Sequence, residues 1–336
     1  MKIEHIIVLK ETREGEGRVA LTPHAVAALV EKNYPIMIES GAGFLAGFSN
    51  EDYLQAGSTL FDLNTHPLPQ HSFILRVKRP TKEREALENT LIPSGSIMMG
   101  FLDPFDVGHE NHISNWQSLG ITTISLELLR LKADDTRNAQ AAMSRFAGRL
   151  ALKDALNRYH GDLPKRVSIL GTGPAGLGAA YAARELQLPV QLFGQQERHR
   201  KDVESKGVIY FVLPEQEQPA FIAKHLSHET IVIAAVRNIG EKPPILINEA
   251  SLEALPEKAV LIDLCTGEGG AIIGSREDAI ITADRGISIV NVSGYPKAEP
   301  KAASEAFAQC MVNLLLDILS PEREMDMRKI DSLSKT

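Results

Sequence analysis

Cysteine is scarce in this sequence, since only Cys265 and Cys310 occur among 336 residues. Two cysteines are too few for a disulfide framework or for a zinc site built from four cysteines. We expect both side chains to be buried as small hydrophobic groups. This cysteine usage fits a reducing compartment best.

Long apolar runs and a basic excess are also absent. No run approaches the roughly 20 apolar residues that a membrane helix needs, and the apolar start is too short for a signal peptide. These absences predict a cytoplasmic protein with no membrane insertion. The 36 Lys and Arg residues against 43 Asp and Glu give a formal charge of −7, which disfavours binding to nucleic acid.

The remaining composition is that of a packed globular protein, with 43% hydrophobic and 24% charged residues. A chain of 336 residues is too long for one hydrophobic core, because single cores stop growing near roughly 250 to 300 residues. We therefore expect two domains.

The first half alternates segments of strand and helix character. Thr22 and Pro23 supply an N-cap and a first-turn proline for a helix that runs through Val30, and a short helix is expected at 51–56. Strand-like apolar runs cover residues 6–9, 35–39, 73–77 and 97–102. This alternation predicts an α/β layer structure.

A long helical stretch at 138–159 is expected to connect to the second half. There, six apolar strands separated by crossovers predict a doubly wound sheet. The strands are expected at residues 167–170, 190–193, 209–213, 231–236, 260–264 and 287–292. An apolar helix at 303–319 is expected to dock on a core, and the polar tail after Pro321 is expected to fray.

The strongest chemical signal follows the first of these strands, where residues 171–176 read Gly-Thr-Gly-Pro-Ala-Gly. In this G-x-G-x-x-G pattern Gly171 makes the tight turn, Gly173 lets a pyrophosphate approach the backbone, and Gly176 lets helix and strand pack closely. The N-terminus of the helix attracts the phosphates. We predict a dinucleotide site that includes Pro174 and Ala175; a glycine-rich turn without a ligand is the alternative.

The acid that usually follows the second strand of such a unit is missing. A carboxylate there holds the ribose hydroxyls of NAD, but this chain has Gly194 at that position. Arg198 and Arg200 lie close by and could bind the 2′-phosphate of NADP, so both cofactors stay possible. Alternatively, these arginines only form a solvated helix face. Ala235 and Val236 are also predicted to line the nucleotide site.

Several motifs in the first half resemble the alanine dehydrogenase and pyridine nucleotide transhydrogenase family. They are Lys10-Glu11, the phrase Glu16-Gly17-Arg18-Val19-Ala20-Leu21-Thr22-Pro23, and Glu39-Ser40-Gly41-Ala42-Gly43. The resemblance extends through residues 76–80, 143–149, the glycine-rich loop, 261–264 with Gly269-Gly270, and 296–319. It covers nearly the whole chain.

The resemblance implies an α/β protein with a Rossmann-type doubly wound parallel sheet and a second, flavodoxin-like α/β domain that the C-terminal helix completes. The implied division is 1–137 for the substrate domain, 138–297 for the NAD(P)-binding domain, and 298–336 for the returning helix with its polar tail. It also implies NAD as cofactor and a homo-oligomer.

Two substrate-binding residues are carried over by motif match. In the alanine dehydrogenase branch an arginine of the R-V-A-L-T-P phrase grips the substrate carboxylate and a lysine on a later strand contacts the carbonyl, and here these are Arg18 and Lys78. A guanidinium fork matches a carboxylate, and a lysine can polarise a carbonyl oxygen. The alternatives are a surface arginine and an exposed lysine at a strand end.

The chain departs from the family in its acid and base. Alanine dehydrogenases carry a catalytic histidine on the strand after the lysine and an aspartate two residues before the Gly-Gly pair. In this chain residues 97–104 contain no histidine, and Gly267 followed by Glu268 stands in place of the aspartate. The predicted catalytic residues are therefore Lys78, Glu268 and Asp103, without a metal. His109 and His112 lie downstream and are expected on a helix surface.

These observations support a nicotinamide-dependent oxidoreductase that acts on a small amino acid or 2-oxo acid. One alternative is the soluble NAD(H)-binding alpha-type subunit of a transhydrogenase, which would need partner chains; residues 100–104 and 312–315 favour that branch. A nucleotide-binding sensor that has lost catalysis is a third reading. The sequence does not identify the substrate.

Overall fold

The computed structural model describes all residues except 1, 65–66, 105–111, 237–241, 266–268 and 335–336. The chain divides into two compact units. The first contains Met1–Met143 and Lys297–Thr336, and the second contains Ser144–Pro296. The first boundary falls inside the long helix α5 (Ala139–Arg158), and the second falls in the short helix η5 (Tyr295–Ala298).

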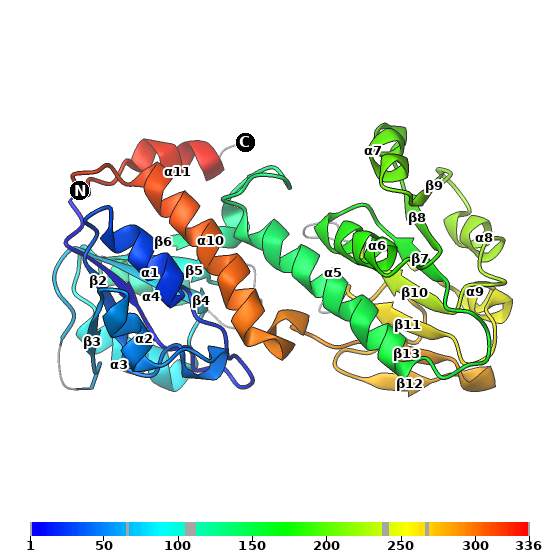
Figure 1. Cartoon of the computed structure of the whole chain (residues 1–336), viewed down its shortest axis with the longest axis horizontal. Coiled ribbons are helices and arrows are strands. Elements are labelled where there is room, and N and C mark those ends of the chain that lie inside the picture. The colour runs from blue at the N-terminus through cyan, green and yellow to red at the C-terminus, as the bar shows by residue number, and fades with distance from the viewer. Residues whose placement is uncertain (1, 65–66, 105–111, 237–241, 266–268, 335–336) are drawn as a thin grey trace. The chain divides into compact units, whose positions relative to one another are not determined.

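The first unit is built on a parallel sheet with the strand order β3-β2-β1-β4-β5-β6 (Figure 1). The strands are β1 (His5–Val8), β2 (Ile36–Glu39), β3 (Thr59–Phe61), β4 (Ser72–Lys78), β5 (Ile97–Phe101) and β6 (Thr122–Ser125). Apart from the short edge strand β3, the order is flavodoxin-like, as predicted. The order reverses between β1 and β4, so their carboxyl ends form a topological switch point.

The helices of this unit begin where the sequence supplies caps. The Thr22 hydroxyl accepts a hydrogen bond from the Ala25 N–H, and Pro23 is the first residue of α1. Ser49 and Asp52 form a capping box at α2. The helices are α1 (Pro23–Val30), η1 (Phe44–Ala46), α2 (Asn50–Gln55), α3 (Lys82–Leu91), α4 (His112–Ser118), η2 (Leu126–Leu128), α10 (Pro300–Ile318) and α11 (Met327–Ser334).

The C-terminal helix α10 packs in the first unit beside α1, as predicted (Figure 1). The Val19 N–H donates to the Ser304 hydroxyl over 2.9 Å, and the Tyr34 hydroxyl donates to the Ser320 carbonyl over 2.9 Å. These hydrogen bonds join segments nearly 300 residues apart in the sequence.

The prediction of a frayed tail was wrong. Residues after Pro321 form the helix α11, whose Ile330 is buried together with Met325 just before it. The Arg130 N–H donates to the Leu333 carbonyl over 2.7 Å. The tail is ordered because it buries Met325 and Ile330, although most of its residues are polar.

The second unit is built on a sheet with the order β12-β13-β11-β10-β7-β8-β9. The predicted strands are all present and parallel, in the Rossmann order with β7 at the centre. They are β7 (Val167–Leu170), β8 (Val190–Gly194), β9 (Ile209–Val212), β10 (Ile231–Ala234), β11 (Val260–Asp263) and β13 (Ser288–Val290). The antiparallel edge strand β12 (Ile280–Thr282) was missed because it is short and exposed.

Buried apolar side chains cover both faces of this second sheet. Helix α6 (Pro174–Glu185) crosses α5 with the two backbones in contact. A Cβ at Gly148 would overlap the Ala175 carbonyl, and a Cβ at Gly178 would overlap the Arg145 carbonyl. The remaining helices are η3 (Glu197–His199), α7 (Arg200–Ser205), α8 (Gln218–Ala223), α9 (Glu249–Ala254) and η4 (Asp284–Gly286).

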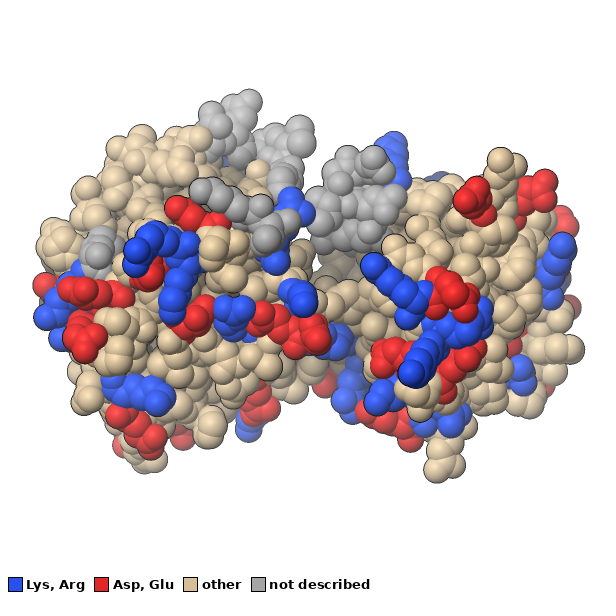
Figure 2. Space-filling view, turned by 90° about the horizontal axis from the view of Figure 1, so that it is seen from above, with Lys and Arg blue, Asp and Glu red and all other residues tan. Residues whose placement is uncertain are grey.

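Cys265 and Cys310 are both buried, as expected. Acidic and basic side chains are interleaved over the face drawn in Figure 2 and do not gather into areas of one sign. None of the helices in the described part of the chain has the length and apolarity needed to cross a bilayer.

Candidate functional site

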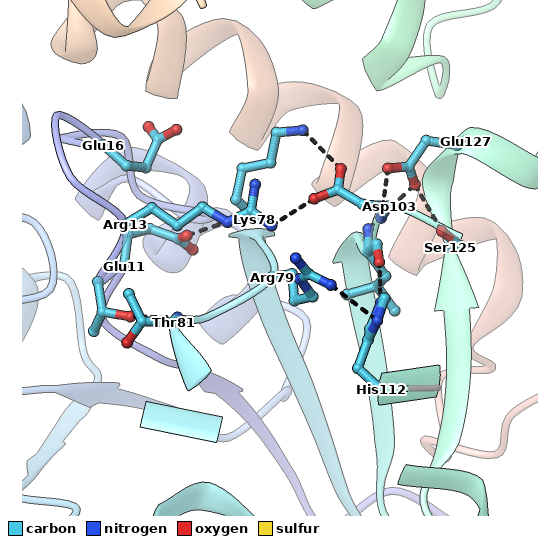
Figure 3. A network of polar contacts seen from close by, with 12 residues as sticks. Glu11, Arg13, Glu16, Lys78, Arg79, Thr81, Asp103, His112, Ser125 and Glu127 are labelled. Atoms are coloured by element: carbon cyan, nitrogen blue, oxygen red, sulfur yellow. Dashed lines mark hydrogen bonds and ion pairs between the residues drawn. The ribbon is translucent and has the colours of Figure 1, made fainter. Parts of the chain in front are cut away.

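Polar side chains converge at the carboxyl ends of β1, β4 and β5 in the first unit (Figure 3). Ligands of open α/β sheets bind outside these ends, at the point where the strand order reverses. Among the predicted residues, Lys78 ends β4 and Asp103 follows β5, so the sheet brings these two together.

Lys78, Asp103 and Arg13 form one cluster. Lys78 Nζ lies 3.1 Å from Asp103 Oδ1, and Arg13 Nη2 lies 2.6 Å from Asp103 Oδ2. Burial raises the pKa of Asp103, but the charges of Lys78 and Arg13 outweigh it and hold that pKa below its usual range. Asp103 is therefore a carboxylate at neutral pH and a weak base, suited to balancing charge or relaying a proton rather than to keeping one.

Glu11 fixes the backbone beneath this cluster. Its Oε1 accepts a hydrogen bond from the Val77 N–H over 2.6 Å, and its Oε2 accepts one from the Lys78 N–H over 3.1 Å. Burial raises the pKa of Glu11 to about 7, against the opposing charge of Arg76. Glu11 thus joins the segment after β1 to the end of β4.

Glu127 binds the backbone at Asp103. Its carboxylate accepts hydrogen bonds from the Leu102 N–H over 3.2 Å and the Asp103 N–H over 3.0 Å, while the Ser125 hydroxyl donates to it over 2.6 Å. Asp103 has a φ of +51°, in the left-handed region that costs a non-glycine residue about 1 kcal/mol or more. These bonds hold the strained backbone that turns the Asp103 carboxylate toward Lys78.

The expectation that His112 lies on a helix surface was wrong. Its ring is buried at the start of α4, packed edge-on against Trp116 with 5.4 Å between ring centroids. Arg79 Nη1 donates to Nδ1 over 3.0 Å, so Nε2 carries the proton that bonds the Leu102 carbonyl. Burial against the apolar Trp116 ring stabilises this placement. His109 lies outside the described residues.

Arg18 is buried, which excludes the alternative of a surface arginine. Its Nε and Nη2 bind the two carboxylate oxygens of Glu16 over 2.7 and 2.6 Å. Burial raises the pKa of Glu16, but hydrogen bonds and charge from Arg18 outweigh it and lower that pKa overall. Arg18 Nη1 lies 3.6 Å from the sulfur of Met143, a weak acceptor. One edge of the guanidinium is thus committed to Glu16, and the other faces a thioether.

The glycine-rich loop lies at the switch point of the second unit, between the ends of β7 and β10. Gly171 has a φ of +109°, and a Cβ there would lie 2.5 Å from the Ala235 carbonyl oxygen and 3.2 Å from Val236 Cγ1. A Cβ at Gly176 would overlap the Gly171 carbonyl. Gly173 has no heavy atom within 4 Å of a Cβ position, so its backbone is open to a ligand.

Helix α6 begins directly behind this opening, with Pro174 and Ala175 in its first turn. Its N-terminal N–H groups and dipole favour an anion. The loop therefore has the shape and polarity that a pyrophosphate requires. In the described part of the chain, no group of three or more His, Cys, Asp or Glu residues is placed to hold a metal.

Glu268 lies outside the described residues. The described residues on both sides of it are anchored to Asp263 at the end of β11. Its Oδ1 accepts a hydrogen bond from the Cys265 N–H over 3.0 Å, and its Oδ2 accepts one from the Ala271 N–H over 2.9 Å.

Two family models match this chain and together cover nearly all of it. The model for the N-terminal domain of alanine dehydrogenase/PNT matches residues 7–147, and the model for the C-terminal domain matches residues 139–335. The chain belongs to the alanine dehydrogenase/PNT family. This confirms the resemblance found in the sequence, and the family is one of NAD(P)-dependent oxidoreductases.

Relatives in both branches of the alanine dehydrogenase/PNT family align over most of their length. An NAD(P) transhydrogenase alpha subunit from Rickettsia prowazekii is 26% identical, over 92% of this chain and 88% of the relative. An "Alanine dehydrogenase 1" from Staphylococcus aureus is also 26% identical, over 98% of this chain and 91% of the relative. A crystal structure of transhydrogenase from Sinorhizobium meliloti has a TM-score of 0.82 at 26% identity, covering 93% of each chain.

Proposed function

We propose that this NAD(P)-dependent oxidoreductase transfers hydride between the nicotinamide C4 of its cofactor and the α-carbon of a small amino acid or 2-oxo acid. In the oxidative direction an amino acid, water and the oxidised nucleotide give a 2-oxo acid, ammonium, the reduced nucleotide and a proton. The observation that carries the proposal is the Lys78–Asp103–Arg13 cluster at the switch point of the first unit.

The second unit supplies the nucleotide site of this proposal. The open backbone at Gly173 and the N-terminus of α6 would hold the pyrophosphate, with Gly171 and Gly176 forming the turn behind it. Ala235 and Val236 would line the same site, at the end of β10. When bound, NAD(H) or NADP(H) supplies the hydride acceptor or donor.

The side chains of the first unit would bind and polarise the substrate. The Lys78 ammonium would hold the substrate carbonyl oxygen. The Asp103 carboxylate would balance its charge and relay to solvent the proton released in the oxidative direction. Arg18 would bind the substrate carboxylate through its Nη1 edge, replacing the weak contact with Met143. Glu268 is proposed as a second acid or base.

Turnover of a 2-oxo acid tests this proposal. NADH or NADPH consumption would be followed with a panel of 2-oxo acids and ammonium, for the parent, Lys78→Met and Arg18→Lys. We expect Lys78→Met to lower kcat by about a hundredfold or more, and Arg18→Lys to raise KM because a bidentate contact is lost.

The matched control is Lys82→Met, at an exposed lysine four residues further on at the start of α3. It should leave turnover unchanged. Turnover by Lys78→Met at the parent rate would contradict the role of Lys78.

The alternative is an alpha-type transhydrogenase subunit. It is supported by the alignment with the Rickettsia subunit over most of both chains and by the absence of the family histidine from residues 97–104. Hydride exchange between two nucleotides that requires added partner chains, without 2-oxo acid turnover, would favour it. Nucleotide binding without either reaction would favour a sensor.

Assembly and location are further aspects of the proposal. We expect a homo-oligomer by analogy with the family, and a cytoplasmic protein because only two cysteines occur among the 336 residues. Light scattering of the purified protein and cell fractionation would test these two expectations.

A further inference from the structure

The end of β8 has no space for an acidic side chain. A Cβ at Gly194 would overlap the Tyr210 hydroxyl and would lie 2.5 Å from Thr172 Cγ2. Tyr210 cannot easily yield, since it is buried and its hydroxyl donates to the Gln196 carbonyl over 2.9 Å. The glycine at this position is therefore imposed by its neighbours.

Gly194 lies next to the glycine-rich loop. The Gly171 N–H donates to the Phe193 carbonyl over 2.8 Å, which joins the end of β8 to the start of the loop. In a dinucleotide fold, the adenosine ribose is bound at this place, and an acid there hydrogen-bonds the 2′-hydroxyl of NAD and repels the 2′-phosphate of NADP. This chain can present neither the hydrogen bond nor the repulsion from position 194.

Of the two arginines after Gly194, one already has partners within the chain and the other can bind a ligand. Arg200 is held by Glu197 over 2.6 Å, by Glu204 over 2.9 Å and by the Tyr210 carbonyl over 2.8 Å. The Arg198 side chain is exposed and makes no hydrogen bond or ion pair with the described residues. Because Arg200 also neutralises Glu197, the positive charge of Arg198 is not cancelled by that neighbouring acid.

We infer that the nucleotide site selects NADP(H) over NAD(H), with Arg198 as the residue that recognises the 2′-phosphate. A guanidinium binds a phosphate through two parallel charged hydrogen bonds, which a 2′-hydroxyl cannot replace. The inference rests on the proposed function, since it assigns the cofactor of the same site.

Equilibrium binding separates this inference from the proposed function. NADPH and NADH would be titrated into the protein by fluorescence, and adenosine 2′,5′-bisphosphate and AMP would compete. We expect NADPH to bind at least tenfold more tightly than NADH, and the bisphosphate to compete better than AMP. Arg198→Ala should weaken NADPH binding by about tenfold to a hundredfold and leave NADH unchanged, as expected for lost charged hydrogen bonds.

The matched control is Lys206→Ala, which removes the same charge at an exposed position just beyond the far end of α7. It should alter neither affinity. NADH binding as tightly as NADPH would overturn the inference and leave the proposed function standing. An NADPH preference that survives Arg198→Ala would overturn the assignment to Arg198. Failure of both nicotinamide nucleotides to bind would overturn the proposed function itself.

Discussion

At the scale of single residues, the charged side chains of the candidate site in the first unit form ion pairs with one another. Lys78 and Arg13 share Asp103, which leaves one net positive charge for an anionic substrate. Arg18 is paired with Glu16, and removing one partner of a buried pair costs roughly 3 to 5 kcal/mol because a charge is left uncompensated. The cluster is therefore positioned by its partners before any substrate arrives.

Glu11 predicts a pH dependence of stability. Its folded pKa is about 7 against an ordinary value of 4.5, so its contribution is full below 4.5 and is lost as pH rises toward 7. We expect the parent to lose up to about 1.4 kcal/mol of unfolding free energy per pH unit in this window. Glu11→Gln should lack this slope, although it should be less stable at every pH because its amide cannot accept both N–H groups. Parallel urea titrations between pH 4.5 and 7.5 measure both; equal slopes would contradict the role of Glu11.

Glu127 is predicted to act through Asp103. Glu127→Gln replaces one acceptor oxygen by an amide that cannot accept the N–H bond, which releases the strained backbone of Asp103. We expect kcat to fall about tenfold or more while nucleotide affinity stays constant, because the nucleotide loop lies in the second unit. The exposed Glu51→Gln is the control. A change in nucleotide affinity alone would contradict this role.

The sequence predicts only part of the candidate site. Lys78 was predicted by motif match with the family, and Asp103 was predicted as an acid or base from the segment that lacks the family histidine. The partners Arg13, Glu16 and Glu127 were not, because each contact depends on how loops fold back over the sheet. The Ser-x-Glu sequence at Ser125 and Glu127, at the end of β6, was an available signal for this acid, but β6 itself was not predicted.

At the scale of elements, buried parallel strands were predictable because they are continuous apolar runs. The edge strands β3, β6 and β12 were not, since each has only three or four residues and at least one exposed side chain, and its pairing depends on the neighbouring strand. Helix α11 was missed for a similar reason, because its stability comes from burying a few side chains such as Ile330.

The glycine-rich loop gives a prediction at this scale. Gly173→Ala should fold like the unmodified protein, because nothing lies within 4 Å of the added Cβ. It should weaken nucleotide binding about tenfold or more, because the added methyl group stands where the pyrophosphate approaches the backbone. Gly176→Ala should instead lower stability by roughly 1 to 3 kcal/mol, because its Cβ would overlap the Gly171 carbonyl. Thermal unfolding and NADPH titration separate the two variants. Equal effects on stability would contradict the distinct roles of these glycines.

At the scale of the whole molecule, each unit has a topological switch point with its own chemistry. Acidic and basic side chains line the carboxyl ends of β1, β4 and β5 in one unit, and an open glycine loop precedes α6 in the other. Membership of the alanine dehydrogenase/PNT family covers both units. The central claim is that the two units together move hydride to or from an α-carbon.

Isotope transfer tests that claim most directly. The protein would be given NADPH and NADH carrying deuterium at C4 of the nicotinamide, in separate samples for each face of the ring, with 2-oxo acids and ammonium. The account predicts an amino acid with deuterium at its α-carbon, detected by mass spectrometry, in the parent and not in Lys78→Met. Deuterium that passes only to a second nicotinamide nucleotide, or that stays on the first, would contradict it.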